Sequence, residues 1–134
     1  MKKLKVMFLM VILCSGGGVV SAKREAPKEV LPITFHGVSY SAPHWRLDIG
    51  AKQNGGYIEA TNLKTDKLLW KLKIYEIKYS GAESDVQDVF ITSLKIAEGN
   101  LEILNEKGDK FVVDLTKRKV IKGANRVYRW REQL

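Results

Sequence analysis

Residues 54–70 read NGGYIEATNLKTDKLLW, and this stretch decides the fold. Two glycines lead into a short run rich in apolar residues, a polar turn with Asn62 and Asp66 follows, and a second apolar run begins at Leu68. Two such runs on either side of an Asn/Asp turn are typical of a β-hairpin. We therefore predict a strand, a turn and a return strand, with Trp70 anchoring the core from the return strand.

The same pattern continues in both directions along the chain. Alternating apolar and polar residues recur in short segments separated by turns, at residues 33–35, 38–40, 57–61, 68–79, 89–96, 101–104 and 111–115. A period of two, rather than 3.6, predicts strands. We expect an all-β fold: a small antiparallel sandwich or partly open barrel of about seven strands, built from consecutive hairpins.

The longest segment, residues 68–79, changes phase along its length. Its apolar residues stand at even positions from Trp70 onward and at odd positions from Tyr75 onward. Both sets can reach one core only if the backbone turns between them. We predict a bulge or bend near Tyr75 and Glu76.

Residues 58–67 and 101–110 resemble each other. At matching positions they share a glutamate, an asparagine, a lysine, an aspartate and a second lysine. Two interpretations stay open: a duplicated hairpin, or two hairpins whose turns need the same residue types. In either case the same turn is expected twice.

The N-terminus has the pattern of a signal peptide. Lysines at positions 2, 3 and 5 precede an apolar run that is too short to cross a bilayer, and small residues end at Ala22. We expect export to the periplasm or outside the cell, with cleavage after Ala22. The predicted organisation is a signal peptide at 1–22, a polar linker at 23–30, a β-domain at 31–122 and a basic aromatic C-terminal tail at 123–134.

Cys14, the only cysteine, gives an alternative. It follows the apolar run and precedes a glycine-rich stretch, which leaves open a lipid-anchored envelope protein attached through Cys14. Against this, Leu13 is bulkier than the residue expected before a lipidated cysteine. Membrane contact is expected only if Cys14 is lipidated. If Cys14 is removed, the processed chain has no cysteine and therefore no disulfide.

Positive charge is concentrated in the tail. Without its first three lysines the chain has 20 basic and 15 acidic residues, and residues 117–134 alone carry a net charge of +6. The five residues expected to bind an anion or a partner there are Arg126, Tyr128, Arg129, Trp130 and Arg131, because arginines beside aromatic rings suit phosphate-rich or glycan surfaces. The alternative is a solvated end, or a last strand whose rings complete the core.

Patterns for catalysis or metal binding are weak. His36 and His44 are the only histidines, which does not fill the usual zinc or copper ligand sets, and no cofactor is expected. Ser39 and Ser41 lie near them in sequence without a nucleophile motif.

The segment 81–88, GAESDVQD, is the most acidic stretch of the chain. Glu83, Asp85 and Asp88 leave open a small hydrolase that acts through these carboxylates. Capping of a short turn and a contact with a lysine also explain them.

Residues 56–70 are similar to the inner part of one blade of a quinoprotein-type β-propeller, in which a glycine opens a strand, a Thr-Gly-Lys turn closes it and a tryptophan ends the next strand. Here Asp66 stands where that family has glycine. The chain holds at most two such units, and a propeller needs at least four. A full propeller and its quinone cofactor are therefore excluded by length.

Several blocks together resemble small uncharacterised bacterial secreted β-proteins. They are Ala42-Pro43, QNGGYI (53–58), LWKLKIY (69–75) and DVQDVFI (85–91). The resemblance covers most of residues 38–115 and implies a fold but no activity. The sequence thus favours an exported, non-catalytic binding or interaction module of the bacterial cell envelope, with an envelope protein or an anionic polymer as partner and no nucleic acid.

Overall fold

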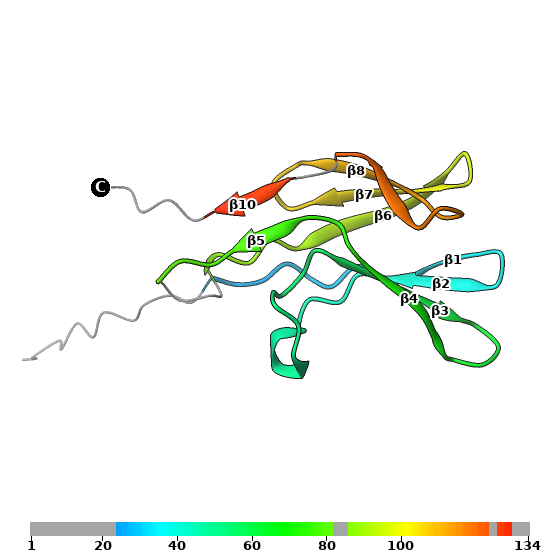
Figure 1. Ribbon diagram of the computed structural model, residues 1–134, viewed down its shortest axis with the longest axis horizontal. Helices are drawn as coiled ribbons and strands as arrows, with labels where there is room; N and C mark the ends of the chain where they lie inside the picture. Colours follow the sequence, from blue (N-terminus) through cyan, green and yellow to red (C-terminus); the bar gives the residue numbers. More distant parts are fainter. Residues whose placement is uncertain (1–23, 82–85, 124–125, 130–134) are drawn as a thin grey trace, which may run out of the picture.

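The computed structural model describes residues 24–81, 86–123 and 126–129, which form two layers of strands (Figure 1). The first sheet has the order β1-β2-β3-β4 and the second has the order β6-β7-β8-β9, and neighbours within both are antiparallel. The first sheet consists of β1 (Ile33–Phe35), β2 (Val38–Ser41), β3 (Tyr57–Asn62) and β4 (Leu68–Lys73). The second consists of β6 (Ile91–Ala97), β7 (Asn100–Asn105), β8 (Lys110–Asp114) and β9 (Lys119–Lys122).

Two further strands form a separate parallel pair, and one short helix completes the described fold. The pair joins β5 (Glu76–Lys78) to β10 (Val127–Arg129), and the 3-10 helix η1 spans Leu47–Ile49. The predicted all-β sandwich is confirmed, and the described strands close no barrel. The described residues form ten strands rather than about seven, because residues 68–79 make two strands and because β9 and β10 are short and basic, without the alternation that marks the others.

The predicted bend in residues 68–79 is confirmed. β4 ends at Lys73, the chain bends at Tyr75, and β5 begins at Glu76. Ile74, Tyr75 and Ile77 are all at most 6% exposed, so residues of both phases enter the same core. The Ile74 N–H donates to the Gly56 carbonyl at 2.7 Å, which fixes the start of the bend against β3.

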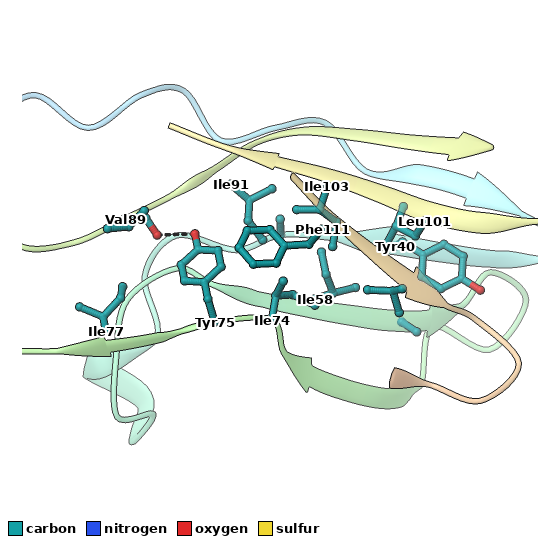
Figure 2. Close-up of a cluster of buried hydrophobic side chains, with 13 residues drawn as sticks. Tyr40, Ile58, Ile74, Tyr75, Ile77, Val89, Ile91, Leu101, Ile103 and Phe111 are labelled. Atoms are coloured by element: carbon teal, nitrogen blue, oxygen red, sulfur yellow. Dashed lines mark hydrogen bonds between the residues drawn. The ribbon is translucent and has the colours of Figure 1, made fainter. Parts of the chain in front are cut away.

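The core lies between the two sheets (Figure 2). Ile58 and Ala60 of β3 are fully buried in one cluster with Leu101 and Val113 of the second sheet. Burial of each of the larger side chains Ile58, Leu101 and Val113 contributes about 1.5–3 kcal/mol. Trp70 packs against this cluster but is only half-buried, so its predicted role as an anchor is partial.

Candidate functional site

Residues of the QNGGYI block hold the chain at the bend through a buried polar side chain. Gln53 is 2% exposed, and its Nε2 donates to the carbonyls of Gly55 at 3.1 Å and Tyr75 at 2.9 Å. Its Oε1 accepts the Ile77 N–H at 2.9 Å. Both ends of the amide are therefore satisfied by backbone groups, as a buried polar side chain requires.

Asn54 connects this loop to the DVQDVFI block. Its Oδ1 accepts the N–H groups of Arg46 and Leu47, both at 3.0 Å, and its Nδ2 donates to the Asp88 carboxylate at 3.3 Å. The Tyr79 hydroxyl donates to the other carboxylate oxygen of Asp88 at 2.6 Å. Burial, and then this hydrogen bond, raise the pKa of Tyr79 well above its ordinary value, so the phenol stays protonated and keeps donating.

The glycine pair is explained by close packing at the same place. Gly55 and Gly56 have φ of 71° and 75°, which side chains rarely adopt. A Cβ on Gly55 would lie 2.8 Å from the Val89 carbonyl oxygen, and one on Gly56 would lie 2.7 Å from Gln53 Nε2. Residues of QNGGYI (53–58), LWKLKIY (69–75) and DVQDVFI (85–91) thus meet in one network that holds the fold together.

The acidic segment is only partly described. Glu83 and Asp85 lie outside the described residues, and their part in a hydrolase stays a prediction. Asp88 is 1% exposed and belongs to the network with Asn54 and Tyr79. Burial and these hydrogen bonds give its carboxylate a structural role.

Arg24, within the predicted linker, lies against the domain. Its guanidinium donates to the Asp88 carbonyl at 2.7 Å and forms an ion pair with the Glu106 carboxylate. The other oxygen of Glu106 accepts the Phe90 N–H at 3.1 Å. Arg24 therefore fixes the start of the predicted linker to the domain through Asp88 and Glu106.

The two histidines lie in different environments. His36 is exposed in the turn between β1 and β2, with φ of 49°. His44 is 2% exposed and its ring lies 4.2 Å from that of Phe90, centroid to centroid. Within the described part of the chain its Nε2 has no hydrogen-bond partner, and burial lowers its pKa. Across residues 24–81, 86–123 and 126–129 no group of three His, Cys, Asp or Glu residues is arranged to hold a metal ion.

The basic tail contains β10, which runs parallel to β5. Tyr128, opposite Ile77 of β5, is half-buried beside the core, and its ring lies 5.1 Å from that of Tyr75. This position agrees with the alternative of a last strand whose ring completes the core. Trp130 and Arg131 lie outside the described residues, and their predicted role in binding stays a prediction.

Arg126 and Tyr128 are held by the turn between β7 and β8. The Asp109 carboxylate accepts a hydrogen bond from the Tyr128 hydroxyl and two from the Arg126 guanidinium, at 3.1 and 3.3 Å. Asn105 Nδ2 donates a hydrogen bond to the Tyr128 hydroxyl oxygen at 2.7 Å. The hydrogen bond from Tyr128, and then those from Arg126, lower the pKa of Asp109. We call these four residues the clasp. Arg129, at the end of β10, is exposed.

A second candidate surface lies on the outer face of the second sheet, where a hollow has a volume of about 300 Å³. The hollow is lined by polar and apolar side chains of β6, β7 and β8: Ser93, Lys95, Glu102, Leu104, Lys110 and Val112. Leu104 and Val112 are half-buried, whereas Lys95 and Lys110 are exposed. Lys122 of β9 stands opposite Val112 and adds a third lysine beside the hollow.

Sequence reasoning missed this hollow. Lys95 stands opposite Glu102, and Lys110 stands opposite Leu104, only because of the register between β6, β7 and β8. The one indication of this hollow in the sequence was the presence of lysines in neighbouring predicted strands, at positions that could share a face. Because the register is set by tertiary pairing, the pattern could not be assigned to one face from the sequence.

No protein-family profile matches the sequence, and no curated protein is similar enough to count as a relative. Among the described residues there is no helix of the length and hydropathy needed to cross a membrane.

Proposed function

We propose that the protein is an exported, non-catalytic binding module of the bacterial cell envelope, and that it holds an anionic polymer on the outer face of the β6–β9 sheet. The hollow in that face carries the proposal. Its rim has the exposed cations Lys95 and Lys110, and its floor has the apolar side chains of Leu104 and Val112. The N-terminal pattern up to Ala22 supports export.

This combination suits a flexible chain that repeats negative groups. Lysine ammonium groups are compact point charges that attract carboxylates or phosphates without demanding one geometry. The apolar floor can cover the carbon backbone of such a polymer. Because the surface is a paired sheet, it loses little conformational freedom on binding.

The roles of the polar core residues agree with a binding module. The side chains of Gln53 and Asn54 make hydrogen bonds within the fold, and the Asp88 carboxylate accepts hydrogen bonds from Tyr79 and Asn54. Arg126 and Tyr128 are likewise engaged by Asp109. The lysine-rimmed hollow is instead open to solvent.

The test is a titration with long-chain inorganic polyphosphate as the probe. We expect Lys95→Glu/Lys110→Glu to weaken binding by at least ~10-fold at low salt, because two attractive charges become repulsive. Lys64→Glu/Lys67→Glu is the matched control, since it makes the same charge change at exposed positions of the turn between β3 and β4. The control should bind like the wild type.

An equal loss in both double variants would assign binding to net charge alone and contradict the proposal. So would unchanged binding by Lys95→Glu/Lys110→Glu. Capture of envelope components on the wild type and on this variant, compared side by side, then identifies the natural polymer as the component that only the wild type retains.

A further inference from the structure

The loop between β2 and β3 exposes large apolar side chains. Trp45 is 50% exposed, Leu47 is 36% exposed and Ile49 is 69% exposed. They alternate along a turn that contains η1, the teal coil that projects away from both sheets in Figure 1. Exposed apolar groups concentrated in one projecting loop mark an interaction surface. We call residues 45–49 the apolar loop.

The apolar loop is held in a fixed shape. Asn54 Oδ1 accepts two of its N–H groups, and the Ala51 N–H donates to the Arg46 carbonyl at 3.0 Å. The Arg46 guanidinium makes two hydrogen bonds to the Glu59 carboxylate, at 2.9 and 3.0 Å, which fasten the loop to the outer face of β3. A loop fixed in this way presents its apolar groups without a large loss of conformational entropy on binding.

Lysines lie beside the points where the loop is fastened. Glu59 and Tyr57 stand opposite Lys71 and Lys73 of β4, and both lysines are exposed. Lys71 Nζ lies 4.9 Å from the centre of the Tyr57 ring, and the Tyr57 hydroxyl lies beside the backbone of the exposed Lys52.

The local balance of charge is positive. Glu59 is paired with Arg46, Asp48 stands in the sequence of the loop, and the exposed Glu29 accepts the His44 N–H at 3.2 Å directly before it. Three exposed lysines, at positions 52, 71 and 73, therefore outnumber Asp48 and Glu29.

We infer that the apolar loop docks on a lipid surface with anionic headgroups. Tryptophan and aliphatic side chains partition into the interface of a bilayer, and nearby lysines are attracted to anionic lipids. This contact needs no lipid on Cys14, and it therefore departs from the expectation that membrane contact occurs only if that residue is lipidated. It uses a different face from the hollow of the second sheet and does not rest on the proposed function.

The charges favour a lipid surface over a second copy of the chain. In a two-fold pair through this loop, Lys71 and Lys73 of the two copies would approach one another. Three partly exposed apolar side chains also form a small area compared with the interfaces of stable dimers. An anionic bilayer matches both the apolar groups and the lysines.

The test is flotation with phosphatidylcholine vesicles, prepared with and without phosphatidylglycerol. The chain from Lys23 onward is used, because all described strands and core residues lie after that position and because the apolar N-terminal run would bind lipid by itself. We expect the wild type to bind the vesicles that contain phosphatidylglycerol. Leu47→Ser/Ile49→Ser should reduce this binding by at least ~10-fold, since two aliphatic side chains no longer enter the interface.

Two further variants separate the contributions. Lys71→Glu/Lys73→Glu should lose ~10-fold or more on the anionic vesicles, because both charges then oppose the surface. Leu63→Ser/Leu68→Ser is the matched control, since these residues are 52% and 57% exposed at the far end of the hairpin, and it should bind like the wild type.

Wild-type binding by Leu47→Ser/Ile49→Ser, or an equal loss in the Leu63→Ser/Leu68→Ser control, would overturn the inference. A wild type that fails to float with anionic vesicles would do the same. A dimer in analytical ultracentrifugation that Leu47→Ser/Ile49→Ser dissociates would make a second copy the occupant of the loop.

Discussion

The turns of the β3–β4 and β7–β8 hairpins use the same local device. Asn62 Oδ1 accepts two N–H groups of its own turn at 2.8 and 3.1 Å, and Asn105 Oδ1 does the same at 3.0 and 3.1 Å. Each asparagine also donates its backbone N–H across the turn, to the carbonyls of Lys67 and Asp109 respectively. The sequence likeness between residues 58–67 and 101–110 therefore corresponds to the same use of an asparagine side chain, although the turn closes at Lys67, five residues after Asn62, and at Asp109, four residues after Asn105.

The two turns differ in their burial and in their contacts with the rest of the chain. The turn at Asn62 stands at an open end, with Leu63 and Leu68 more than half exposed. Asn105 is 1% exposed, and it binds Tyr128 as part of the clasp. Similar local sequences thus give a solvated turn in one hairpin and, in the other, a turn that begins at a buried asparagine bound by the C-terminal strand β10.

Truncation after Lys122 should have the largest effect on this comparison. It removes β10, the Tyr128 ring beside Tyr75 and the polar contacts to Asn105 and Asp109. We expect a loss of ~2–4 kcal/mol in the free energy of unfolding, the size typical for a lost buried aromatic group. Urea denaturation measures it. An unchanged midpoint would show that the clasp does not stabilise the fold.

Replacement of the two asparagines by alanine should give unequal losses. Asn105→Ala should cost ~2–3 kcal/mol, because a buried side chain loses its hydrogen bonds to the turn and to Tyr128, whereas Asn62→Ala should cost only ~1 kcal/mol. The same denaturation experiment compares them. Equal losses would mean that the hydrogen bonds within each turn, and not the contact with Tyr128, determine the loss of unfolding free energy.

Tyr128→Phe should have a smaller effect of ~1–2 kcal/mol, because it keeps the ring and removes only the hydroxyl that joins Asn105 to Asp109. Thermal unfolding followed by near-ultraviolet circular dichroism is suitable, since the signal reports on packed aromatic rings. A loss as large as that of the truncation would assign the whole effect of β10 to this hydroxyl.

The smallest effect is expected in the dependence of stability on pH. Asp109 has a folded-state pKa below its ordinary value of 3.8, chiefly because the Tyr128 hydroxyl donates to it and then because of Arg126. Its contribution is therefore fully present above pH 3.8 and is lost as the pH falls through the folded pKa. Asp109→Asn should make the decline of stability in this acidic range shallower. A decline identical to that of the wild type would remove Asp109 from the acid response.

The sequence was sufficient for features that depend on local pattern. The alternation of apolar residues predicts the all-β fold, the phase change after Ile74 predicts the bend, and the Asn and Asp residues predict the turns. Gly55 and Gly56 likewise indicate the entry into a strand, whereas their close packing against Val89 and Gln53 is visible only in the structure.

Features that depend on register or on distant partners could not be predicted. β9 and β10 are basic and short, and β10 is a strand only because it pairs with β5 across some 50 residues of chain. The hollow around Lys95 and Lys110 requires the register of three strands. The described part of the tail contacts the domain through Arg126 and Tyr128, which required the distant partner Asp109, and the binding of an anion by the tail stays a prediction.

The difference between the turns also bears on the candidate surfaces. Asp109 of the clasp directly precedes Lys110, which lies on the rim of the hollow. The clasp therefore restricts the position of the backbone at one edge of the proposed binding face. The apolar loop is fastened instead through Glu59 on β3. Loss of the clasp should therefore affect binding of polyphosphate more than binding of vesicles.

A double-mutant cycle between Asn105→Ala and Tyr128→Phe tests most directly whether β10 makes the second turn different from the first. We predict a coupling energy of at least ~1 kcal/mol between these two substitutions, whereas Asn62→Ala and Tyr128→Phe should be additive to within ~0.5 kcal/mol. Additivity in both cycles would contradict the clasp and would leave the two hairpins equivalent.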